Sequence, residues 1–170
     1  NAGGGTVQLE AGTYIFNTVV YLDSDNLTIQ GAQAGDTTIK MVGALDNAFK
    51  SSNIAARANT TIKDLTVNMA EATGSYAQAI DFNTNTTSGL IDNLTINGAN
   101  QNQRVVFLNG ADNVAIKNSK FWGSDIRYGN AIYILGDVDN VIIENNRIHY
   151  YHRGVYVAGK TTNLVIQNNN

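Results

Sequence analysis

One six-residue phrase, repeated along the chain, constrains the fold more than any other feature. It reads asparagine, then leucine or valine, any residue, isoleucine, any residue, and finally asparagine or glycine. Clear copies begin at Asn26, Asn93, Asn113, Asn140 and Asn163, and a looser copy begins at Asp64. Successive copies start 38, 29, 20, 27 and 23 residues apart. A unit this short cannot bury its own apolar side, so its recurrence predicts a solenoid of stacked coils.

Apolar and polar residues alternate within each phrase, as they do in a half-buried β-strand. In the copy at 113–118, we expect Val114 and Ile116 to point inward and Lys117 outward. A second series of apolar strands precedes the phrases, at 38–43, 79–83, 105–110, 131–136 and 154–159. A shorter third strand follows some phrases, at 120–122 and 147–149.

Three short strands per coil, broken by Gly, Asn and Asp, predict the fold class. It is an all-β, parallel β-helix of roughly six coils, right-handed because parallel crossovers almost always are. The repeated asparagines belong at the corners, where Asn tolerates the left-handed conformation and its amide can bond the coils above and below. We expect the same role for Asn145, Asn146 and 168–170.

The length of 170 residues fits one domain covering 1–170. The chain opens directly before a strand and closes inside a phrase, without an amphipathic helix to cap the coils. Since an open solenoid exposes unpaired strands, we expect a segment of a longer protein, or self-association through the solenoid ends.

Composition limits the partners and cofactors. The net charge of −3, without a basic stripe, gives no reason to expect nucleic acid. There is no cysteine, so neither a disulfide nor a thiolate metal site can form. No apolar run is long enough to span a membrane. Asp23-Ser24-Asp25-Asn26 looks like a calcium motif but lacks the loop that ends in Glu, so no cofactor is certain and calcium stays an open alternative.

The first coil carries a recognisable order of residues. Gly3-Gly4-Gly5-Thr6-Val7 lead to Ala11-Gly12-Thr13-Tyr14, and Thr37-Thr38-Ile39-Lys40-Met41 follow the first phrase. This opening resembles that of the pectate-lyase-like β-helix superfamily, and is most similar to the catalytic module of mannuronan C5-epimerases and related polyuronate lyases. The resemblance is strong over residues 3–41 and loose elsewhere. It implies a secreted or cell-surface protein that acts on an acidic polysaccharide of the alginate or pectin type.

In that superfamily the substrate lies along the outer surface of one sheet, which here corresponds to the second strand series. Aligning the glycines that end these strands places one residue of each strand outward, namely Lys40, Asp81, Phe107, Tyr133 and Tyr156. Aromatic rings in a row can stack on sugar rings. They also occur because aromatic pairs suit β-sheets. We expect these residues to bind the substrate.

The segments that lead into this sheet hold most of the remaining reactive side chains. Arg104, Trp122 and Arg127 are expected to bind the substrate. The catalytic candidates fall within 149–153 and are His149, Tyr150, His152 and Arg153.

A lyase or epimerase needs a cation beside the uronate carboxylate, a base for the C5 proton, and a tyrosine or histidine acid. Arg153 or Lys40 could be the cation. Either histidine could be the base, because histidine titrates near neutral pH. Tyr150, Tyr151 or Tyr156 could be the acid.

One departure from the epimerase pattern leaves the activity open. That family carries a tyrosine and then Asp-Pro-His on the strand before an asparagine phrase. This chain has Gly154 at the tyrosine position and Val157-Ala158-Gly159 at the Asp-Pro-His position. The alternatives are a glycan-binding β-helix without catalysis and a structural segment of an adhesin or tailspike. An ice-binding face is disfavoured because the threonines form no regular ranks.

Overall fold

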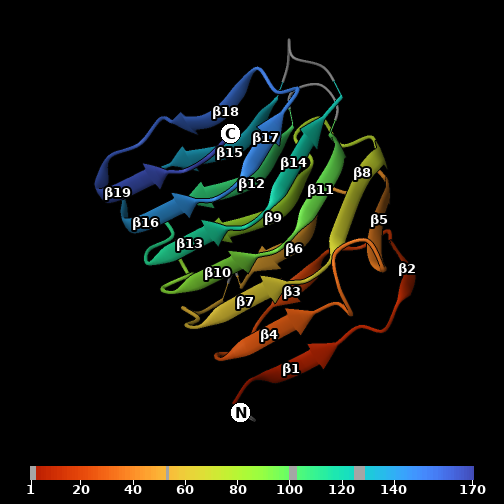
Figure 1. Cartoon of the computed structure of the whole chain (residues 1–170). Coiled ribbons are helices and arrows are strands. Elements are labelled where there is room, and N and C mark those ends of the chain that lie inside the picture. The colour runs from red at the N-terminus through yellow and green to blue at the C-terminus, as the bar shows by residue number, and fades with distance from the viewer. Residues whose placement is uncertain (1–2, 53, 100–102, 125–128) are drawn as a thin grey trace.

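The chain winds into a parallel β-solenoid of about six coils, which confirms the predicted fold class. A computed structural model describes residues 3–52, 54–99, 103–124 and 129–170. Each full coil gives one strand to each of three parallel sheets, named A, B and C below. Figure 1 shows the coils stacked from β1 near the N-terminus to β18 and β19 at the other end.

Sheet A contains β1 Gly5–Gln8, β4 Leu27–Gln30, β7 Thr60–Lys63, β10 Gly89–Asp92, β13 Val114–Lys117, β16 Val138–Glu144 and β19 Thr161–Gln167. Sheet B contains β2 Gly12–Phe16, β5 Thr37–Gly43, β8 Thr66–Ala72, β11 Thr95–Ala99, β14 Lys120–Gly123 and β17 Arg147–His149. Sheet C contains β3 Val20–Leu22, β6 Asn47–Ser51, β9 Gln78–Asn83, β12 Arg104–Asn109, β15 Asn130–Leu135 and β18 Arg153–Val157.

The core is built from apolar residues that repeat at the same place in every coil. In sheet A an unbroken line of isoleucines stacks in register, formed by Ile29, Ile62, Ile91, Ile116, Ile143 and Ile166. Ile62, Ile91, Ile116 and Ile143 are fully buried. Burying one such side chain contributes about 1.5–3 kcal/mol, so a stacked line holds adjacent coils in one register. Val114 is likewise buried, as predicted from the alternation in 113–118.

Asparagine ladders line the two corners that border sheet A. At the corner before the sheet, Asn59 donates to Asn26 (Nδ2–Oδ1 2.8 Å), Asn140 to Asn113 (3.0 Å) and Asn163 to Asn140 (3.0 Å). Each of these residues has a φ between 53° and 56°. This is the left-handed region that Asn tolerates better than most residues, so the predicted corner role is confirmed.

The corner after sheet A has its own left-handed series, formed by Asp64, Asn93, Asn118, Asn145 and Asn168. Asn93 Nδ2 donates to Asp64 Oδ1 (2.8 Å), and Asn118 Nδ2 to Asp92 Oδ1 (2.8 Å). Asn146 follows this corner and differs from the ladder residues, because it is buried. Its amide donates to the Ile116 carbonyl (2.9 Å).

The six phrases therefore belong to two places in the coil, and not to one as their similarity suggested. The copies at Asn26, Asn113, Asn140 and Asn163 lead into sheet A, whereas those at Asp64 and Asn93 lead into sheet B. Both corners hold a left-handed residue, and in all six phrases the residue after it is Leu or Val, so one pattern serves both. This explains the irregular spacing of the phrases. Ladder partners are separated by 33, 27 and 23 residues.

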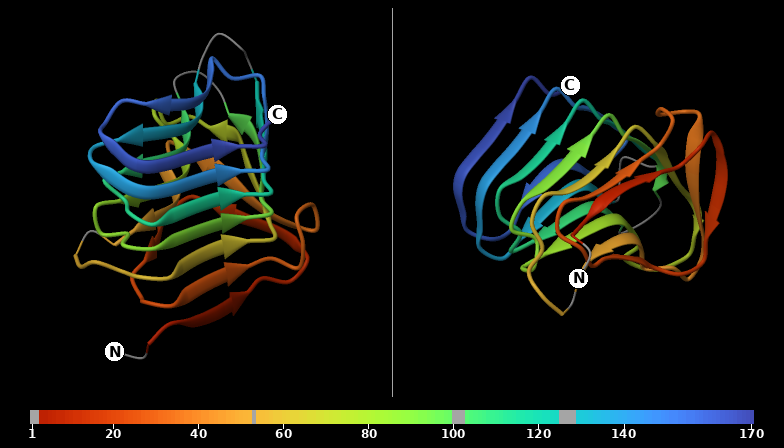
Figure 2. Two further views of the ribbon diagram at one scale, coloured as in Figure 1. Left: turned by 60° about the vertical axis from the view of Figure 1, so that its left-hand side comes forward. Right: turned by 90° about the horizontal axis from the view of Figure 1, so that it is seen from below.

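No helix occurs in the described part of the chain, and thus none there is long and apolar enough to cross a membrane. The side view in Figure 2 shows sheet A as a regular stack. The connections outside sheet A vary in length, from two residues between β15 and β16 to eight between β6 and β7.

Candidate functional site

One outward-facing column runs the length of sheet C. Cross-strand pairing places Tyr21, Lys50, Asp81, Phe107, Tyr133 and Tyr156 next to one another in that order. The predicted column from Asp81 to Tyr156 is therefore confirmed as a column. Their neighbours Ile80, Val106 and Ile132 are fully buried, as period-two alternation requires.

Lys40 does not belong to this column, and its predicted placement was wrong. It lies on β5 of sheet B, opposite Ile15 and Asn68, and its Nζ is 2.7 Å from Glu71 Oε1. The alignment failed because Gly43, which ends β5, was matched to the glycines that follow sheet C strands. In this coil the sheet C strand is β6, and Lys50 occupies the column position.

Three aromatic rings stack on one another in the C-terminal half of the column. The Phe107 and Tyr133 centroids are 5.4 Å apart with an interplanar angle of 27°, and those of Tyr133 and Tyr156 are 5.1 Å apart. Phe107 is only 7% exposed. Because the rings cover each other, they do not offer an open row of faces to sugar rings. The column stabilises the sheet and supports the groups above it.

Two arginines lie over these rings. The Arg104 Cζ atom is 4.7 Å from the Tyr133 centroid and 5.2 Å from that of Phe107, and it also lies 5.1 Å from Tyr76. The Arg153 Cζ atom is 4.2 Å from the Tyr156 centroid. Cation–π contacts of this kind hold a guanidinium in place without using its N–H donors.

Arg104 and Arg153 share one register position, with Asn130 between them. Neighbouring strands lie about 4.8 Å apart, so the two arginine backbones are about 10 Å apart along the solenoid axis. Neither arginine has a carboxylate partner among the described residues. The Asn130 Oδ1 atom is buried and has no hydrogen-bond donor there. The result is a short line of fixed donors without an anion among the residues that the structure describes.

The N-terminal half of the column is different, because its cation is already paired. Lys50 Nζ lies 3.5 Å from Asp81 Oδ2, and the Asp81 side chain is 9% exposed. Burial raises the pKa of Asp81 above its ordinary value, and Lys50 partly opposes this effect. Asp81 Oδ1 has no hydrogen-bond partner. This half therefore carries no free positive charge.

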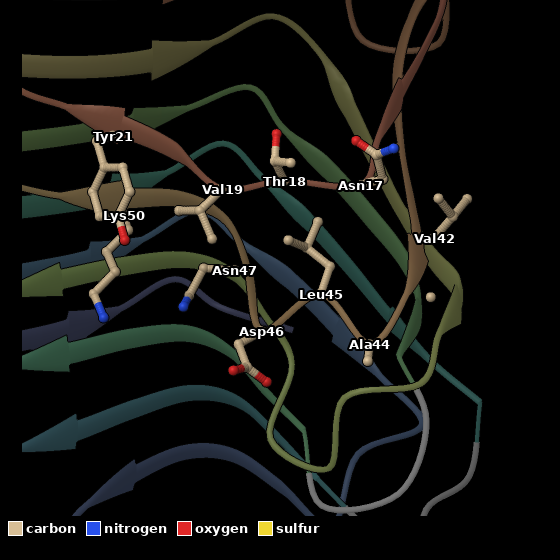
Figure 3. A pocket seen from close by; sticks show the side chains of 11 residues that line it. Asn17, Thr18, Val19, Tyr21, Val42, Ala44, Leu45, Asp46, Asn47 and Lys50 are labelled. Carbon is tan, nitrogen blue, oxygen red and sulfur yellow. The ribbon is translucent and has the colours of Figure 1, made fainter.

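A pocket of about 610 Å³ opens beside Tyr21 and Lys50. Its wall also includes Val19, Leu45, Asp46 and Asn47, and Figure 3 shows these side chains around the opening. Sequence reasoning missed this pocket because the loop from β5 to β6 carries no motif. The signal that could have found it is the second apolar strand after Gly43, which shows that the coil turns once more before reaching sheet C.

His149 and Trp122 lie on sheet B, away from the sheet C column. Their rings stack with centroids 4.7 Å apart, and Arg147 Nε donates to His149 Nε2 (2.9 Å). Tyr150 is 6.3 Å from Trp122 and has a φ of 62°. It is the one described residue other than Gly, Asn and Asp with positive φ, which marks a strained position.

The segment 149–153 therefore crosses between two sheets instead of lining one site. β17 ends at His149 on sheet B, and β18 begins at Arg153 on sheet C. Tyr151 lies between them with a buried hydroxyl that lacks a partner, and burial raises its pKa. His152 is exposed and makes no hydrogen bond or ring contact with the described residues. The predicted substrate contact Arg127 lies outside the described residues.

The calcium-like motif at Asp23–Asn26 serves the corner. Asp25 Oδ1 accepts a hydrogen bond from the Ala58 backbone N–H (2.9 Å), and Asn26 begins the first ladder. Across the described ranges, no three histidine or carboxylate side chains are grouped to hold a metal ion.

Neither a known family model nor a curated protein sequence matches the chain. Among solved structures, a crystal structure of pectin methylesterase in complex with hexasaccharide VII matches with a TM-score of 0.58 and 12% sequence identity. The match covers 88% of this chain and 49% of that one, so the chain spans about half the length of the pectin methylesterase. At this identity the likeness shows the fold alone. The chain thus shares the parallel β-helix fold of a pectin methylesterase.

Proposed function

We propose that this protein is a secreted or cell-surface β-helix that binds an acidic polysaccharide along the outer face of sheet C. The observation that carries the proposal is the pair Arg104 and Arg153, aligned in register on aromatic rings and lacking carboxylate partners among the described residues. Guanidinium groups recognise carboxylates through paired N–H donors.

The spacing suits a polymer better than a single sugar. Two fixed guanidiniums about 10 Å apart along the axis can each meet a carboxylate of one extended chain. A polyuronate presents a carboxylate on every residue, so a chain parallel to the axis offers anions along that line. Asn130 lies between the arginines at the same register position and adds no charge to the line. The overall charge of −3 makes this local positive line stand out.

The polymer class rests on two supports. The opening of the chain resembles polyuronate lyases and epimerases. The structural match is a pectin methylesterase crystallised with a hexasaccharide. Both point to pectin or alginate. Because the ring faces are covered, binding should depend mainly on charge and hydrogen bonds, and should therefore weaken with salt.

Lyase or epimerase chemistry on the same polymer is the second candidate. Arg153 and Tyr156 lie in contact, with Cζ 4.2 Å from the ring centroid, and His152 precedes Arg153 on the exposed rim. This coil thus supplies a cation, a phenol and an imidazole, which are the groups such a reaction needs.

Calorimetric titration with oligogalacturonate, oligoalginate and a neutral dextran oligomer of equal length tests the proposal. We expect both acidic oligomers to bind, with affinity falling as salt rises, and the dextran to bind far more weakly. Equal affinity for all three, or none for any, would overturn it. The same mixtures report catalysis, because β-elimination yields an unsaturated uronate that absorbs ultraviolet light and epimerisation changes the proton NMR spectrum.

A further inference from the structure

The pocket beside Tyr21 and Lys50 has a built lining that the arginine line does not explain. Val19, Val42 and Leu45 supply apolar walls, and Asn47 and Asp46 supply polar groups. A volume of about 610 Å³ falls in the range of small-molecule sites, which combine apolar walls with a few placed polar groups. A pyranose ring matches this lining, because its C–H faces are apolar and its hydroxyls both donate and accept.

Asn47 is the most informative residue of the pocket. It is 6% exposed, and its Oδ1 atom is buried without a hydrogen-bond partner. Figure 3 shows its amide between the side chains of Lys50 and Asp46. Leaving such an atom unpaired costs about 1–3 kcal/mol, whereas Asn residues in the ladders are all paired. A ligand hydroxyl in the pocket can accept from the other end of this amide, the nitrogen that Figure 3 shows.

The loop that forms the pocket is fixed by the next coil. The Thr73 backbone N–H donates to the Gly43 carbonyl (2.7 Å), and that of Gln78 to the Asp46 carbonyl (2.7 Å). Gly74 packs so closely that a Cβ there would lie 2.9 Å from the Leu45 carbonyl oxygen. The pocket is therefore preformed, which lowers the ordering cost of binding.

The charges of the pocket select against an anion. Lys50 is engaged by Asp81 at 3.5 Å. Asp46 is exposed and has no described ion-pair partner, so the uncompensated charge in the pocket is negative. A uronate carboxylate would be repelled there. A neutral sugar can donate a hydroxyl to Asp46 and accept from the Asn47 amide.

We propose that this pocket is a subsite for an uncharged pyranose unit, at the N-terminal end of the same sheet C face whose arginines bind uronates. The inference rests on the proposed function for the identity of the polymer, a glycan with acidic and neutral parts. The site itself rests on the pocket.

The test compares two probes, a neutral galacto-oligosaccharide and an oligogalacturonate of the same length, by calorimetric titration. Asn47→Leu keeps the number and branching of the side-chain heavy atoms and removes the amide. We expect it to weaken neutral-sugar binding about tenfold, the loss of one hydrogen bond to a buried group, and to leave oligogalacturonate binding unchanged. Arg104→Ala should do the reverse. Asp46→Asn should raise the affinity of the pocket for the acidic probe.

The outcomes separate the two proposals. If wild-type protein does not bind the neutral probe, or if Asn47→Leu binds it as well as wild type does, the pocket proposal fails while the arginine site can still stand. If only the acidic oligomer fails to bind, the proposed function falls and the pocket remains a neutral-sugar site.

An NMR titration tests where the neutral sugar binds. Shifts of the Asn47 side-chain amide signals on adding the neutral probe, absent with the acidic one, would place the sugar in the pocket. Thermal unfolding of each variant verifies that the fold is kept.

Discussion

Polar side chains at the corners beside sheet A are hydrogen-bonded to neighbouring coils, whereas several on the outer face of sheet C have no partner among the described residues. At the corners, Asn140 donates to Asn113 and accepts from Asn163, both at 3.0 Å, so its amide is satisfied by the coils on either side. On sheet C, the Oδ1 atoms of Asn47, Asp81 and Asn130 are buried without donors among the described residues. Arg104 and Arg153 contact rings and no described carboxylate.

The difference shows how to separate structural from functional polar residues in a solenoid. A group whose partners repeat with the coils stabilises the stack, because every coil supplies the same bond. A group without an internal partner lowers stability unless something outside the chain completes it. The asparagines that are most visible in the sequence thus belong to the scaffold, and the less conspicuous residues of sheet C to the candidate site.

The largest expected effect follows removal of the two guanidiniums of the arginine line. Arg104→Ala with Arg153→Ala should weaken oligouronate binding by more than about 100-fold, because each substitution loses a charge-assisted contact of about 1.5–3 kcal/mol. Titration calorimetry measures the loss. Arg147→Ala is the matched control, since Arg147 also lies over an aromatic ring but on sheet B, 5.3 Å from Trp122. Equal losses in the control and the double variant would contradict the assignment to sheet C.

Breaking one rung of a ladder should cost stability and leave binding intact. Asn140→Ala should lower the free energy of unfolding by about 2–3 kcal/mol, because it loses two side-chain bonds and places a Cβ-bearing residue without an amide at a φ of 54°. Urea denaturation gives the value. Asn140→Gly keeps the left-handed backbone, so a loss as large as that of the alanine variant would show that the backbone argument is wrong.

The Lys50–Asp81 ion pair should make the effect of a Lys50 substitution on the free energy of unfolding depend on pH. Lys50→Met should lower stability by about 2 kcal/mol at pH 7, because it leaves a buried carboxyl without its cation. The pKa of Asp81 is already raised in the folded protein, and this change raises it further. The cost of the change is therefore complete above the raised pKa of Asp81 in the variant, shrinks as the pH falls through that pKa, and is gone once the pH reaches the ordinary value of 3.8.

Denaturation of wild type and Lys50→Met at several pH values gives this difference directly. Asp81→Asn in the same background should remove the pH dependence. A stability difference that stays constant from pH 7 to acid would mean that the loss comes from the lysine stem and not from its charge.

The smallest effect concerns a polar atom that lacks a partner but faces the core. Tyr151→Phe should raise stability by about 0.5–1 kcal/mol, because the tyrosine hydroxyl is buried without a partner. The melting temperature of the two proteins measures it. A loss of stability would indicate that the hydroxyl has a hydrogen-bond partner. Tyr151 would then no longer count as an unpaired group of the scaffold.

The sequence predicted the parts of the fold that repeat. Alternation in 113–118 identified a strand with Val114 buried, and the same rule found the column from Asp81 to Tyr156. Lys40 was misplaced because coil length varies along the chain. One sequence alone does not show that this coil has a further strand, β6, before it reaches the position that was aligned. Lys50 was missed for the same reason.

The remaining errors of site prediction come from distance across a corner. His149 and Arg153 are four residues apart, but a left-handed residue at Tyr150 sends the chain from one sheet to the next. Nothing local in the sequence shows that Tyr, a rare choice for positive φ, occupies a corner. Likewise, the contact between Arg104 and Tyr76 joins two coils, and only the stacked structure reveals it.

The constancy of sheet A has an engineering consequence. The separation of ladder partners in sequence falls from 33 to 23 residues along the chain, while the two left-handed corner residues of a coil stay five positions apart, as Asn59 and Asp64 or Asn163 and Asn168 do. The variation lies in the connections outside sheet A, for example between β6 and β7, where eight residues join the strands, and between β15 and β16, where two do. Sheet A thus keeps the coils in register independently of coil length. New loops can therefore be inserted in the connections outside it without changing the register of the stack.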